Sequence, residues 1–522
     1  MHQSVSHAAL ASLLLLSSAL TTYAQSSRIN RGTGPAPAPG TLFLVPERVA
    51  TRDGRLVEAE RGLMFVPMLR SDPLRGVLGV EVWRFRALTP TNAPPVFRLP
   101  GGPGHDGLHV NLADEGYYER QILPTIGFAD FIVVGQRGIY TSPPNTLCER
   151  AMGVEHARRC RQYWLDAGLD PKGFTVVEAA HDVADIARAL GYDSIVVRGG
   201  SFGSHWALAL MRLHPDLVAR VLLSGTEGPD HTYDDPAHRY AALRRIAASA
   251  ESSPQVAELL PKGGLLAALD SIAARLSRAP VTVEVRDSTS APSQTIIFGA
   301  DMIPSFAFGY TGSANTRSGV GRWPAEILRV FYGDFTPAAR RLAARVQGST
   351  QPRWPFSYNV GAAEMLDCAS GGTPARIRRI GTDSLHRIVG DGGVSWEVEM
   401  CREWNVDLGD DFRRDVVSNI PTVIVHGTWD LSTPYENALE ILPNLRRGRL
   451  VTVEGGTHSA LAEAQAADTA FARALADFLR TGSTARLPDR VVLSPVRWEI
   501  PSDLPSLARS HNRLAWPRGS RR

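Results

Sequence analysis

The chain has 522 residues, which is long for one domain and indicates either two units or one core with a large insertion. Hydrophobic residues make up 43% and charged residues 21%, as in ordinary globular proteins. The 56 basic and 53 acidic residues give a formal net charge of +3, and this near-balance argues against a nucleic-acid partner.

Residues 1–24 have the pattern of a secretory signal peptide. Ala8–Leu20 is an uninterrupted apolar and small-residue run, too short for a spanning helix, which needs roughly 20 residues. Thr22 and Ala24 put small residues at the positions that signal peptidase reads. Because no Lys or Arg precedes the run, a membrane anchor or a buried N-terminal helix remains an alternative. We expect a secreted or periplasmic protein with no membrane partner after cleavage.

The Pro- and Gly-rich stretch that follows predicts a linker over residues 25–40. Beyond it come short apolar or alternating runs that predict strands. The last two runs suit strands buried on both faces of a parallel sheet. These runs are Thr41–Val45, Leu63–Leu69, Val77–Ala87, Pro95–Leu99 and Phe131–Val134.

The clearest predicted helix begins after Thr175, which with Glu178 has the form of a capping box, and ends at Gly191. A strand, a second helix and another strand follow. Such alternation is typical of a doubly wound, mostly parallel α/β sheet. The three segments are Ser194–Val197, Phe202–His214 and Arg220–Leu223.

The alternation is lost over residues 229–418, which have mainly helical segments and Pro- and Gly-rich breaks. It resumes with strand Thr422–Val425, a helix near Tyr435–Ile441, strand Leu450–Val453 and helix Ala460–Leu479. The sequence therefore predicts a core of residues 41–228 and 419–480, interrupted by a large, mainly helical cap. We expect the tail, residues 481–522, to pack loosely over the surface.

Four cysteines, Cys148, Cys160, Cys368 and Cys401, lie at spacings that do not fit a metal or redox motif. An even count in an oxidising compartment favours disulfides. Sequence order favours pairing the first with the second and the third with the fourth. Three pairings are possible, and buried free thiols are the alternative.

Gly199-Gly200-Ser201-Phe202-Gly203 is a GxSxG motif between a predicted strand and a predicted helix. This is the context of a nucleophile elbow, in which small neighbours let Ser201 sit in a sharp turn with its hydroxyl exposed. A tight turn with an incidental serine is the alternative interpretation. The motif alone is weak, and its context makes Ser201 the candidate nucleophile.

A serine hydroxyl needs a base, and in α/β-hydrolases the acid and the base follow the serine in that order. Asp430 comes just after one late predicted strand, and His458 just after the next. We therefore predict a triad of these two residues with Ser201. Glu454, in the same short loop as the histidine, is the competing acid. Glycines at Gly101–Gly104 suit an oxyanion hole, with the N–H groups of Gly102 and Phe202 as donors.

The chain resembles the prolyl iminopeptidase and secreted tripeptidyl aminopeptidase family of α/β-hydrolase serine peptidases. The matching segments are GGPG at Gly101–Gly104, QRG at Gln136–Gly138, the helix at Ala179–Tyr192, GGSFGS at Gly199–Ser204, RLHPDLVARVLLSG at Arg212–Gly225 and GTWDLSTPYENA at Gly427–Ala438. The resemblance implies an α/β-hydrolase fold and cleavage of peptides near their N-terminus. The family usually has Asp where this chain has Gly135, which removes a local partner for Arg137.

Family members hold the free amine of the substrate with acidic residues near the cap, which makes Glu227 the first candidate here. Glu364 and Asp367, inside the insertion, are the next candidates, and exposed carboxylates that are merely solvated are the alternative. We thus predict a secreted serine exopeptidase acting on peptides through an acyl-enzyme, with no metal or cofactor. An esterase with the same triad and a non-catalytic binding protein are the rival functions.

Overall fold

The structure is a computed structural model that describes residues 37–105, 117–139, 141–144, 146, 148, 153–286, 293–308, 316–350 and 360–513. The predicted signal peptide and all but the last four residues of the predicted linker lie outside these ranges. Within them, no helix is both long enough and apolar enough to cross a membrane.

The described residues form one ten-stranded sheet in the order β1-β2-β3-β5-β4-β6-β7-β10-β11-β12. The pairings of β1 with β2, β2 with β3 and β3 with β5 are antiparallel, and all the remaining pairings, from β5–β4 to β11–β12, are parallel. The predicted fold class is confirmed. The strands are β1 Leu42–Ala50, β2 Leu56–Pro67, β3 Val77–Phe85, β4 Val96–Leu99, β5 Phe131–Val134, β6 Ile195–Ser201, β7 Val218–Thr226, β10 Thr422–Gly427, β11 Gly448–Glu454 and β12 Arg490–Val492.

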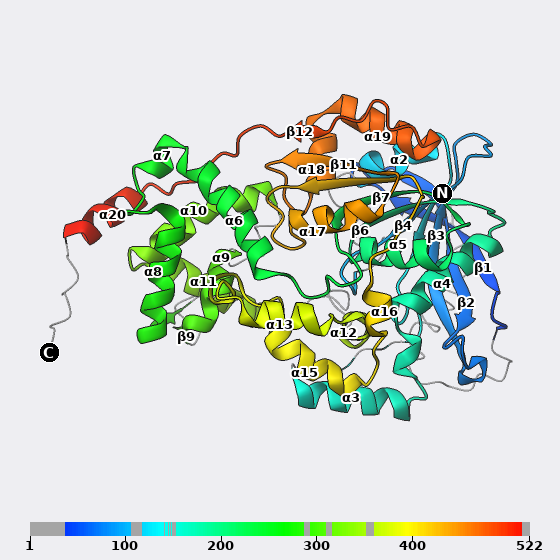
Figure 1. Cartoon of the computed structure of the whole chain (residues 1–522), viewed down its shortest axis with the longest axis horizontal. Coiled ribbons are helices and arrows are strands. Elements are labelled where there is room, and N and C mark those ends of the chain that lie inside the picture. Colours follow the sequence, from blue (N-terminus) through cyan, green and yellow to red (C-terminus); the bar gives the residue numbers. More distant parts are fainter. Residues whose placement is uncertain are drawn as a thin grey trace, which may run out of the picture.

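Helices cover both faces of this sheet (Figure 1). One face carries α3 (Val154–Asp166), α4 (Val176–Ala189), α5 (Phe202–Leu213) and α17 (Tyr435–Ile441). The other carries α2 (Leu123–Ile126), α18 (Ala460–Ala467) and α19 (Thr469–Thr481). Because successive strand residues alternate faces, Val197 of β6 lies in the first core and Val196 in the second.

The order of strands has a reversal that positions the functional loops. After β4 the chain moves to β5 on one side, and then to β6 on the other side of β4. Ligands of open α/β sheets bind outside the carboxyl ends of the strands at such a switch point. The loop after β4 and the turn after β6 meet at this switch point.

Side-chain hydrogen bonds to the backbone set the starts of two helices, α4 and α19. The Thr175 side chain caps α4 by accepting a hydrogen bond from the Glu178 N–H at 3.3 Å, as the capping pattern predicts. The single helix expected over Ala460–Leu479 is instead two helices. Asp468 breaks it, because its carboxylate accepts the N–H groups of Ala470 and Phe471 and starts α19.

The insertion consists of two parts rather than one cap. The first, which we call the lobe, has a hydrophobic core of its own and lies beside the sheet (Figure 1). Its elements are α6 (Pro236–Glu251), α7 (Pro254–Ala257), α8 (Gly264–Arg278), the hairpin β8–β9 (Val281–Val285 and Gln294–Phe298), α9 (Ile303–Ala307), α10 (Arg317–Phe331), α11 (Thr336–Thr350) and α14 (His386–Val389).

The second part, which we call the bridge, packs against the sheet domain. Its helices are α12 (Val360–Ser370), α13 (Pro374–Thr382), α15 (Val394–Trp404) and α16 (Gly409–Arg413). Trp404 of α15 contacts Trp164 of α3, with ring centroids 4.9 Å apart, and Met365 of α12 belongs to the first sheet core. The Cys368–Cys401 disulfide joins α12 to α15, and Cys148 pairs with Cys160, as sequence order predicted.

The tail differs from the expectation of loose packing. β12 adds a parallel strand to β11, and α20 (Leu504–Arg513) reaches the lobe and packs on α10 (Figure 1). Val491 and Leu504 are buried, so the tail spans both the sheet and the lobe. The prediction missed this packing because the tail is rich in Pro and Arg and has few apolar residues.

Candidate active site

Ser201 ends β6 and directly precedes α5, in the sharp turn expected of a nucleophile elbow. Its φ of 56° is a left-handed conformation that non-glycine residues rarely adopt. A Cβ on Gly199 would lie 2.1 Å from the Gly203 carbonyl oxygen, and one on Gly203 would lie 2.2 Å from the Leu99 oxygen. These two glycines are therefore required for the close approach of β4, β6 and α5.

The loop after β4 packs directly against this turn. A Cβ on Gly101 would lie 3.1 Å from the Ser201 Cβ. Gln136 fixes the loop from both ends: its Oε1 accepts the Gly104 N–H at 2.8 Å, and its Nε2 donates to the Gly101 oxygen at 2.8 Å. Gln136 was not among the predicted site residues, although the QRG motif that contains it was the available signal.

Gly102, the predicted oxyanion donor, has a φ of 111°, a conformation that strongly favours glycine. Phe202, the other predicted donor, is the first residue of α5, where backbone N–H groups have no partner within the helix. The two predicted donors thus flank Ser201, one from the loop and one from the helix.

Gly135 offers Arg137 no local carboxylate, as expected, and the partners of Arg137 come from elsewhere in the fold. Its guanidinium is fully buried, forms an ion pair with Asp182 of α4, and donates to the backbone oxygens of Met68 and Gly173 at 2.7 and 2.6 Å. The carboxylate that holds it comes from a distant helix rather than from the same loop. The Arg137 side chain therefore anchors this loop to the sheet domain.

Asp430 and His458 are in direct contact. The His458 Nδ1 lies 3.0 Å from Asp430 Oδ2 and 3.1 Å from Oδ1. The Ser432 and Thr433 N–H groups each donate to Asp430 Oδ1 at 2.9 Å, and the Thr433 hydroxyl donates to Oδ2 at 2.9 Å. The carboxylate is thereby held in one orientation, which also fixes the orientation of the imidazole.

The electrostatics of this pair follow from those contacts. Burial alone would raise the pKa of Asp430, but His458 and His426 outweigh it and hold the pKa well below its ordinary value. Burial alone would lower the pKa of His458, but the Asp430 carboxylate raises it above its ordinary value. The aspartate is therefore ionised across the physiological range, and the histidine is a stronger base than a free imidazole.

Gly225 connects the pair to Ser201. The pairing of β6 with β7 places Gly200 opposite Ser224 and Ser201 opposite Thr226, with a register shift between them at Gly225. A Cβ on Gly225 would lie 2.9 Å from His458 Cε1, so the imidazole rests against this backbone. No hydrogen bond joins Ser201 to His458 in the described structure, and such bonds often tighten only when substrate is bound.

The competing acid points elsewhere. Glu454 lies 3.4 Å from the Arg490 guanidinium of β12, with 37% of its side chain exposed. Its contact is with the edge of the sheet rather than with the imidazole.

A group of five carboxylates, which we call the acidic group, faces the same end of the sheet. Glu227 follows β7, Asp234 precedes α6, Glu364 and Asp367 lie on α12, and Glu397 lies on α15. The charges of the other four all act on Asp367. The structure thus brings together the three candidates Glu227, Glu364 and Asp367, and adds two that sequence reasoning missed.

Glu227 is tied to the nucleophile turn by its backbone. Its N–H donates to the Ser204 hydroxyl at 2.8 Å, and that hydroxyl donates to the Ser201 oxygen at 2.6 Å. Its side chain is nine-tenths buried, and the nearest basic nitrogen is His205 Nδ1, 3.9 Å away. Burial lowers the pKa of His205 to about 4, so this ring is neutral and brings no positive charge.

The acidic group is electrostatically unsatisfied. Burial and then the charge of Asp234 raise the pKa of Glu227 to about 8. Burial, and then the neighbouring carboxylates, raise the pKa of Asp367 well above its ordinary value and that of Glu397 to about 7. Across the described parts of the chain, only Asp234 of this group has an arginine ion pair, with Arg239. A cation from outside would therefore stabilise these carboxylates.

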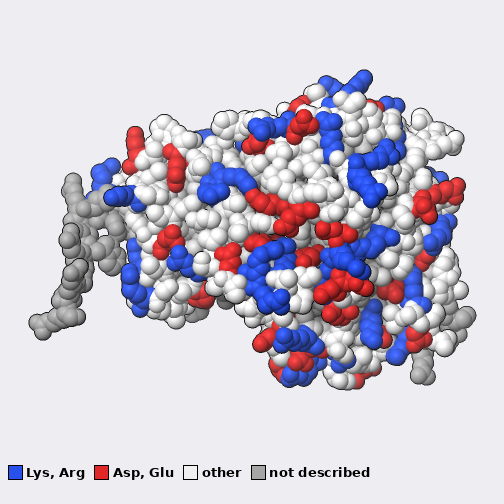
Figure 2. All heavy atoms as spheres, in the orientation of Figure 1, with Lys and Arg blue, Asp and Glu red and all other residues white. Residues whose placement is uncertain are grey.

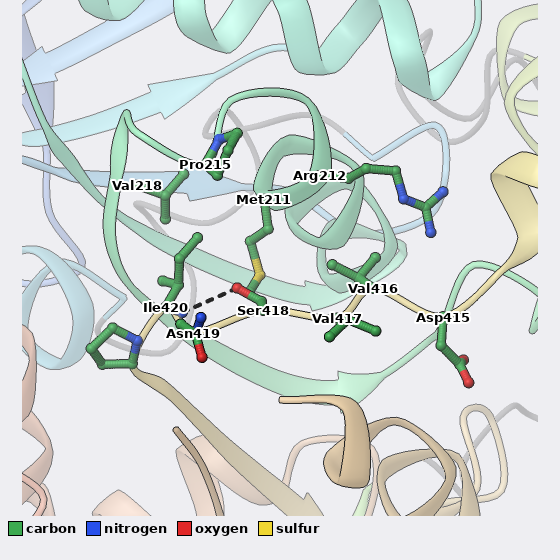
Figure 3. A pocket seen from close by; sticks show the side chains of 11 residues that line it. Met211, Arg212, Pro215, Val218, Asp415, Val416, Val417, Ser418, Asn419 and Ile420 are labelled. Carbon is green, nitrogen blue, oxygen red and sulfur yellow. Dashed lines mark hydrogen bonds between the residues drawn. The ribbon is translucent and has the colours of Figure 1, made fainter. Parts of the chain in front are cut away.

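The described residues hold no cluster of three or more His, Cys, Asp or Glu side chains arranged for a metal. A cavity of about 600 Å³ lies at the opposite end of the sheet, where Val218 begins β7 and Ile420 precedes β10 (Figure 3). Acidic and basic side chains are interspersed on the face seen in Figure 2, as the near-neutral net charge leads one to expect.

Comparison with known proteins agrees with this architecture. The family described as "alpha/beta hydrolase fold" matches residues 94–256, and the family described as "TAP-like protein" matches residues 389–491. No curated protein matches the chain.

Solved structures with the same kind of fold are only distantly similar. A proline iminopeptidase-related protein from Thermus thermophilus is 16% identical, covers 81% of this chain and 99% of its own, and has a TM-score of 0.35. An esterase from Exiguobacterium antarcticum is 13% identical, covers 77% of this chain and 96% of its own, and also has a TM-score of 0.35.

Proposed function

We propose that this chain, which belongs to the tripeptidyl aminopeptidase-like family of α/β-hydrolases, is an exported serine exopeptidase that cleaves peptides near a free N-terminus. The observation that carries the proposal is the buried acidic group beside the nucleophile turn. Buried carboxylates without a cationic partner destabilise the fold. A substrate with a positive charge accounts for their presence, whereas an uncharged ester or amide substrate does not.

In this proposal Ser201 attacks the scissile carbonyl while His458 takes the hydroxyl proton. The Oγ–C bond forms, and the N–H groups of Gly102 and Phe202 stabilise the oxyanion. The C–N bond then breaks, and His458 gives the proton to the leaving amine. Water, deprotonated by the same imidazole, hydrolyses the acyl-enzyme and restores the serine. Asp430 keeps the imidazole in the required tautomer throughout.

The acidic group supplies the preference for a free amine. The α-ammonium of the substrate would lie against Glu227, whose backbone is held to the nucleophile turn through Ser204. Asp367 and Glu397 come from the bridge, which packs against the sheet domain. The distance between the ammonium site and Ser201 would set how many residues are released.

Export is part of the proposal. The apolar run at Ala8–Leu20 with small residues before the expected cleavage site supports it, as do the two disulfides.

The test compares matched peptides that differ only in acetylation of the N-terminus. The free-amine peptide should be cleaved with a kcat/KM at least roughly tenfold above that of the acetylated peptide, because an acetylated amine brings no charge to the acidic group. Ser201→Ala should fold and lose both turnover and fluorophosphonate labelling. A preference for the acetylated peptide, or for simple esters over every peptide, would refute the exopeptidase.

A further inference from the structure

His426 is a buried histidine in the strand that leads to Asp430. It is the next-to-last residue of β10, four positions before the aspartate, and its side chain is fully buried. Its Nδ1 accepts the Thr226 N–H at 3.3 Å, and its Nε2 lies 2.8 Å from the Thr433 backbone oxygen. Because a backbone N–H can only donate and a carbonyl oxygen can only accept, the ring proton is on Nε2. Both nitrogens of this side chain are therefore used inside the protein.

The bond to Thr433 holds the turn of residues 430–433, which we call the acid turn. The Thr433 N–H and hydroxyl donate to the two Asp430 oxygens at 2.9 Å each, and the hydroxyl also lies 3.2 Å from His458 Nδ1. Thr433 lies between β10 and α17, outside both elements, and the His426 ring gives its carbonyl oxygen a donor. The same residue that orients the catalytic carboxylate is thus itself held by His426.

The bond to Thr226 fixes the end of β7 beyond its ladder with β10. That ladder ends at the pair formed by Val425 and Ser224. Thr226 lies two residues further on, and it is the residue opposite Ser201 in the ladder of β7 with β6. His426 therefore links the strand end beside the nucleophile to the turn that holds the acid.

The His426 ring is also close to the catalytic carboxylate itself. Its Nε2 lies 3.5 Å from Asp430 Oδ2. Burial raises the pKa of Asp430, whereas the charge of His458 and then the hydrogen bond from His426 lower it. The two imidazoles differ in access, since 22% of the His458 side chain is exposed and none of the His426 side chain is. His426 can therefore act on the reaction only through its neighbours and not by touching a substrate.

We propose that His426 is a positioning residue of the triad, which keeps Asp430 aligned with His458 by holding the acid turn against the end of β7. The inference rests on the serine mechanism of the proposed function and not on the identity of the substrate. If the Thr433 oxygen lost its donor, the acid turn could shift and carry the Thr433 N–H and hydroxyl away from the carboxylate. The imidazole would then be less well oriented as a base. The groups that bind substrate would stay in place.

Two substitutions separate the two hydrogen bonds of the ring. In His426→Gln the side-chain amide nitrogen reaches the position of Nε2 and can still donate to the Thr433 oxygen. In His426→Asn the shorter amide reaches only the position of Nδ1, so it can accept the Thr226 N–H but cannot hold Thr433. His426→Asn should lower kcat about 10- to 100-fold with little change in KM, the effect of a misaligned catalytic group. His426→Gln should recover most of that loss.

Two readouts distinguish positioning from a general loss of stability. The acidic limb of the pH profile of kcat/KM should move to lower pH in His426→Asn, because burial lowers the pKa of His458 and a displaced Asp430 would oppose that effect less. Asp234 and Glu463 also raise this pKa and stay in place, so the shift should be smaller than in Asp430→Asn. In a double-mutant cycle, His426→Asn should add almost no further loss to Asp430→Asn, since both changes act through one carboxylate.

His231→Asn is the matched control. His231 is also buried, its Nδ1 accepts the Gly228 N–H at 3.0 Å, and its Nε2 contacts Glu440 at 2.8 Å. It therefore has the same bonding pattern as His426 but does not hold the acid turn. This variant should leave kcat and the acidic limb unchanged, even where thermal unfolding shows a comparable loss of stability.

The outcomes distinguish this inference from the function on which it rests. Wild-type kcat in folded His426→Asn, or a loss that adds in full to that of Asp430→Asn, would overturn the positioning role. A rise in KM for free-amine peptides at unchanged kcat would overturn it too, because His426 would then serve Glu227 through Thr226.

If His426→Asn does not fold, His426→Gln decides. Near-wild-type kcat with an unchanged acidic limb supports the proposal, and a large loss of kcat in the folded variant contradicts it. Every rate is measured on a free-amine peptide and on a p-nitrophenyl ester, and the same relative loss on both supports action through the triad. A preference of the wild type for the ester over every peptide would refute the exopeptidase alone and leave the role of His426 intact.

Discussion

Two buried carboxylates near the nucleophile turn, Asp430 and Glu227, differ in their partners and in the direction of their pKa shifts. Asp430 is fully buried and accepts hydrogen bonds from two backbone N–H groups and a threonine hydroxyl, with His458 3.0 Å away. Glu227 is nine-tenths buried and forms no ion pair with a lysine or arginine among the described residues, although the charge of Arg376 partly opposes the rise of its pKa. The pKa of the first is lowered, whereas that of the second is raised to about 8.

The difference in pKa reflects which partners the protein provides around each carboxylate. Around Asp430 the chain itself supplies every donor, so the charge is fixed before any substrate arrives. Around Glu227, Asp367 and Glu397 the chain supplies more carboxylates than cations, and in the proposed function a cationic substrate balances their charge. Environments that separate the pKa values of like groups mark different roles for them.

The largest expected effect on catalysis comes from changing Asp430, whose carboxylate is fully hydrogen-bonded by the protein. Asp430→Asn should lower kcat by on the order of 10⁴-fold, because the amide no longer fixes the imidazole tautomer or stabilises its protonated form. The acidic limb of the pH–rate profile of any residual activity should also move to lower pH, since the carboxylate that raises the pKa of His458 is gone. Steady-state kinetics from pH 4 to 9 check both points.

Glu454→Gln is the matched control for that change. Its carboxylate pairs with Arg490 at the sheet edge, so turnover should change less than twofold. A large loss in Glu454→Gln together with a nearly silent Asp430→Asn would reverse the assignment of the acid.

The contact between Asp430 and His458 could be predicted from strand order. Asp430 and His458 each follow a parallel strand, and the carboxyl ends of such strands meet at one edge, so their proximity could be predicted without tertiary detail. The acidic group could be predicted only in part. Glu397 joins Glu227 through the packing of the bridge on the sheet domain, which no local pattern encodes, whereas Asp234 lies in the segment between β7 and α6.

Other differences have equally local causes. In the hairpin of residues 281–298, β8 alternates apolar and polar residues over only five positions and β9 does not alternate, so the signal for strands is short within a mainly helical region. The partner of Arg137 lies 45 positions away on α4, beyond the reach of a motif-based argument. The carboxylate of Asp468 interrupted a helix whose apolar periodicity continued on both sides.

The Cys368–Cys401 disulfide tests whether the two regions are mechanically separate. Replacing both cysteines by alanine should lower the free energy of unfolding by roughly 2–4 kcal/mol. Asp367 is adjacent to Cys368, and Glu397 lies one turn before Cys401, so KM for free-amine peptides should rise severalfold. Fluorophosphonate labelling of Ser201, which depends on the Asp430 region, should be unchanged after folding is verified.

Removing the Cys148–Cys160 disulfide in the same way is the control. It should cost comparable stability without a selective rise in KM for free amines, because the described acidic group lies on other elements. Equal kinetic effects of both changes would mean that the bridge does not position the acidic group independently.

Glu227→Gln tests whether the Glu227 carboxylate binds the α-ammonium of the substrate. KM for free-amine peptides should rise roughly 10- to 50-fold, the effect of losing a charge-assisted contact, while acetylated peptides and small esters change little. Glu440→Gln is the control: Glu440 already contacts His231 at 2.8 Å, and its pKa is lowered to about 2. Should both variants behave alike, the ammonium would be held by Asp367 or Glu364 instead.

The smallest effect is on stability and has an unusual sign. The pKa of Glu227 rises from 4.5 to about 8 on folding, so the folded state binds more protons than the unfolded state between these values. The contribution of this carboxyl to stability is complete below about pH 4.5 and is lost as pH rises through about 8. Glu227→Gln should therefore be neutral at pH 5 and stabilise the protein by roughly 1–2 kcal/mol at pH 9, a gain in stability at the expense of binding.

Asp430→Asn should do the opposite, because the lowered pKa of Asp430 makes its ionised form stabilising at every pH above its ordinary value. Thermal unfolding of both variants at pH 5 and pH 9 checks this, and parallel shifts at pH 9 would contradict the idea that one carboxylate is satisfied by the protein and the other by its substrate.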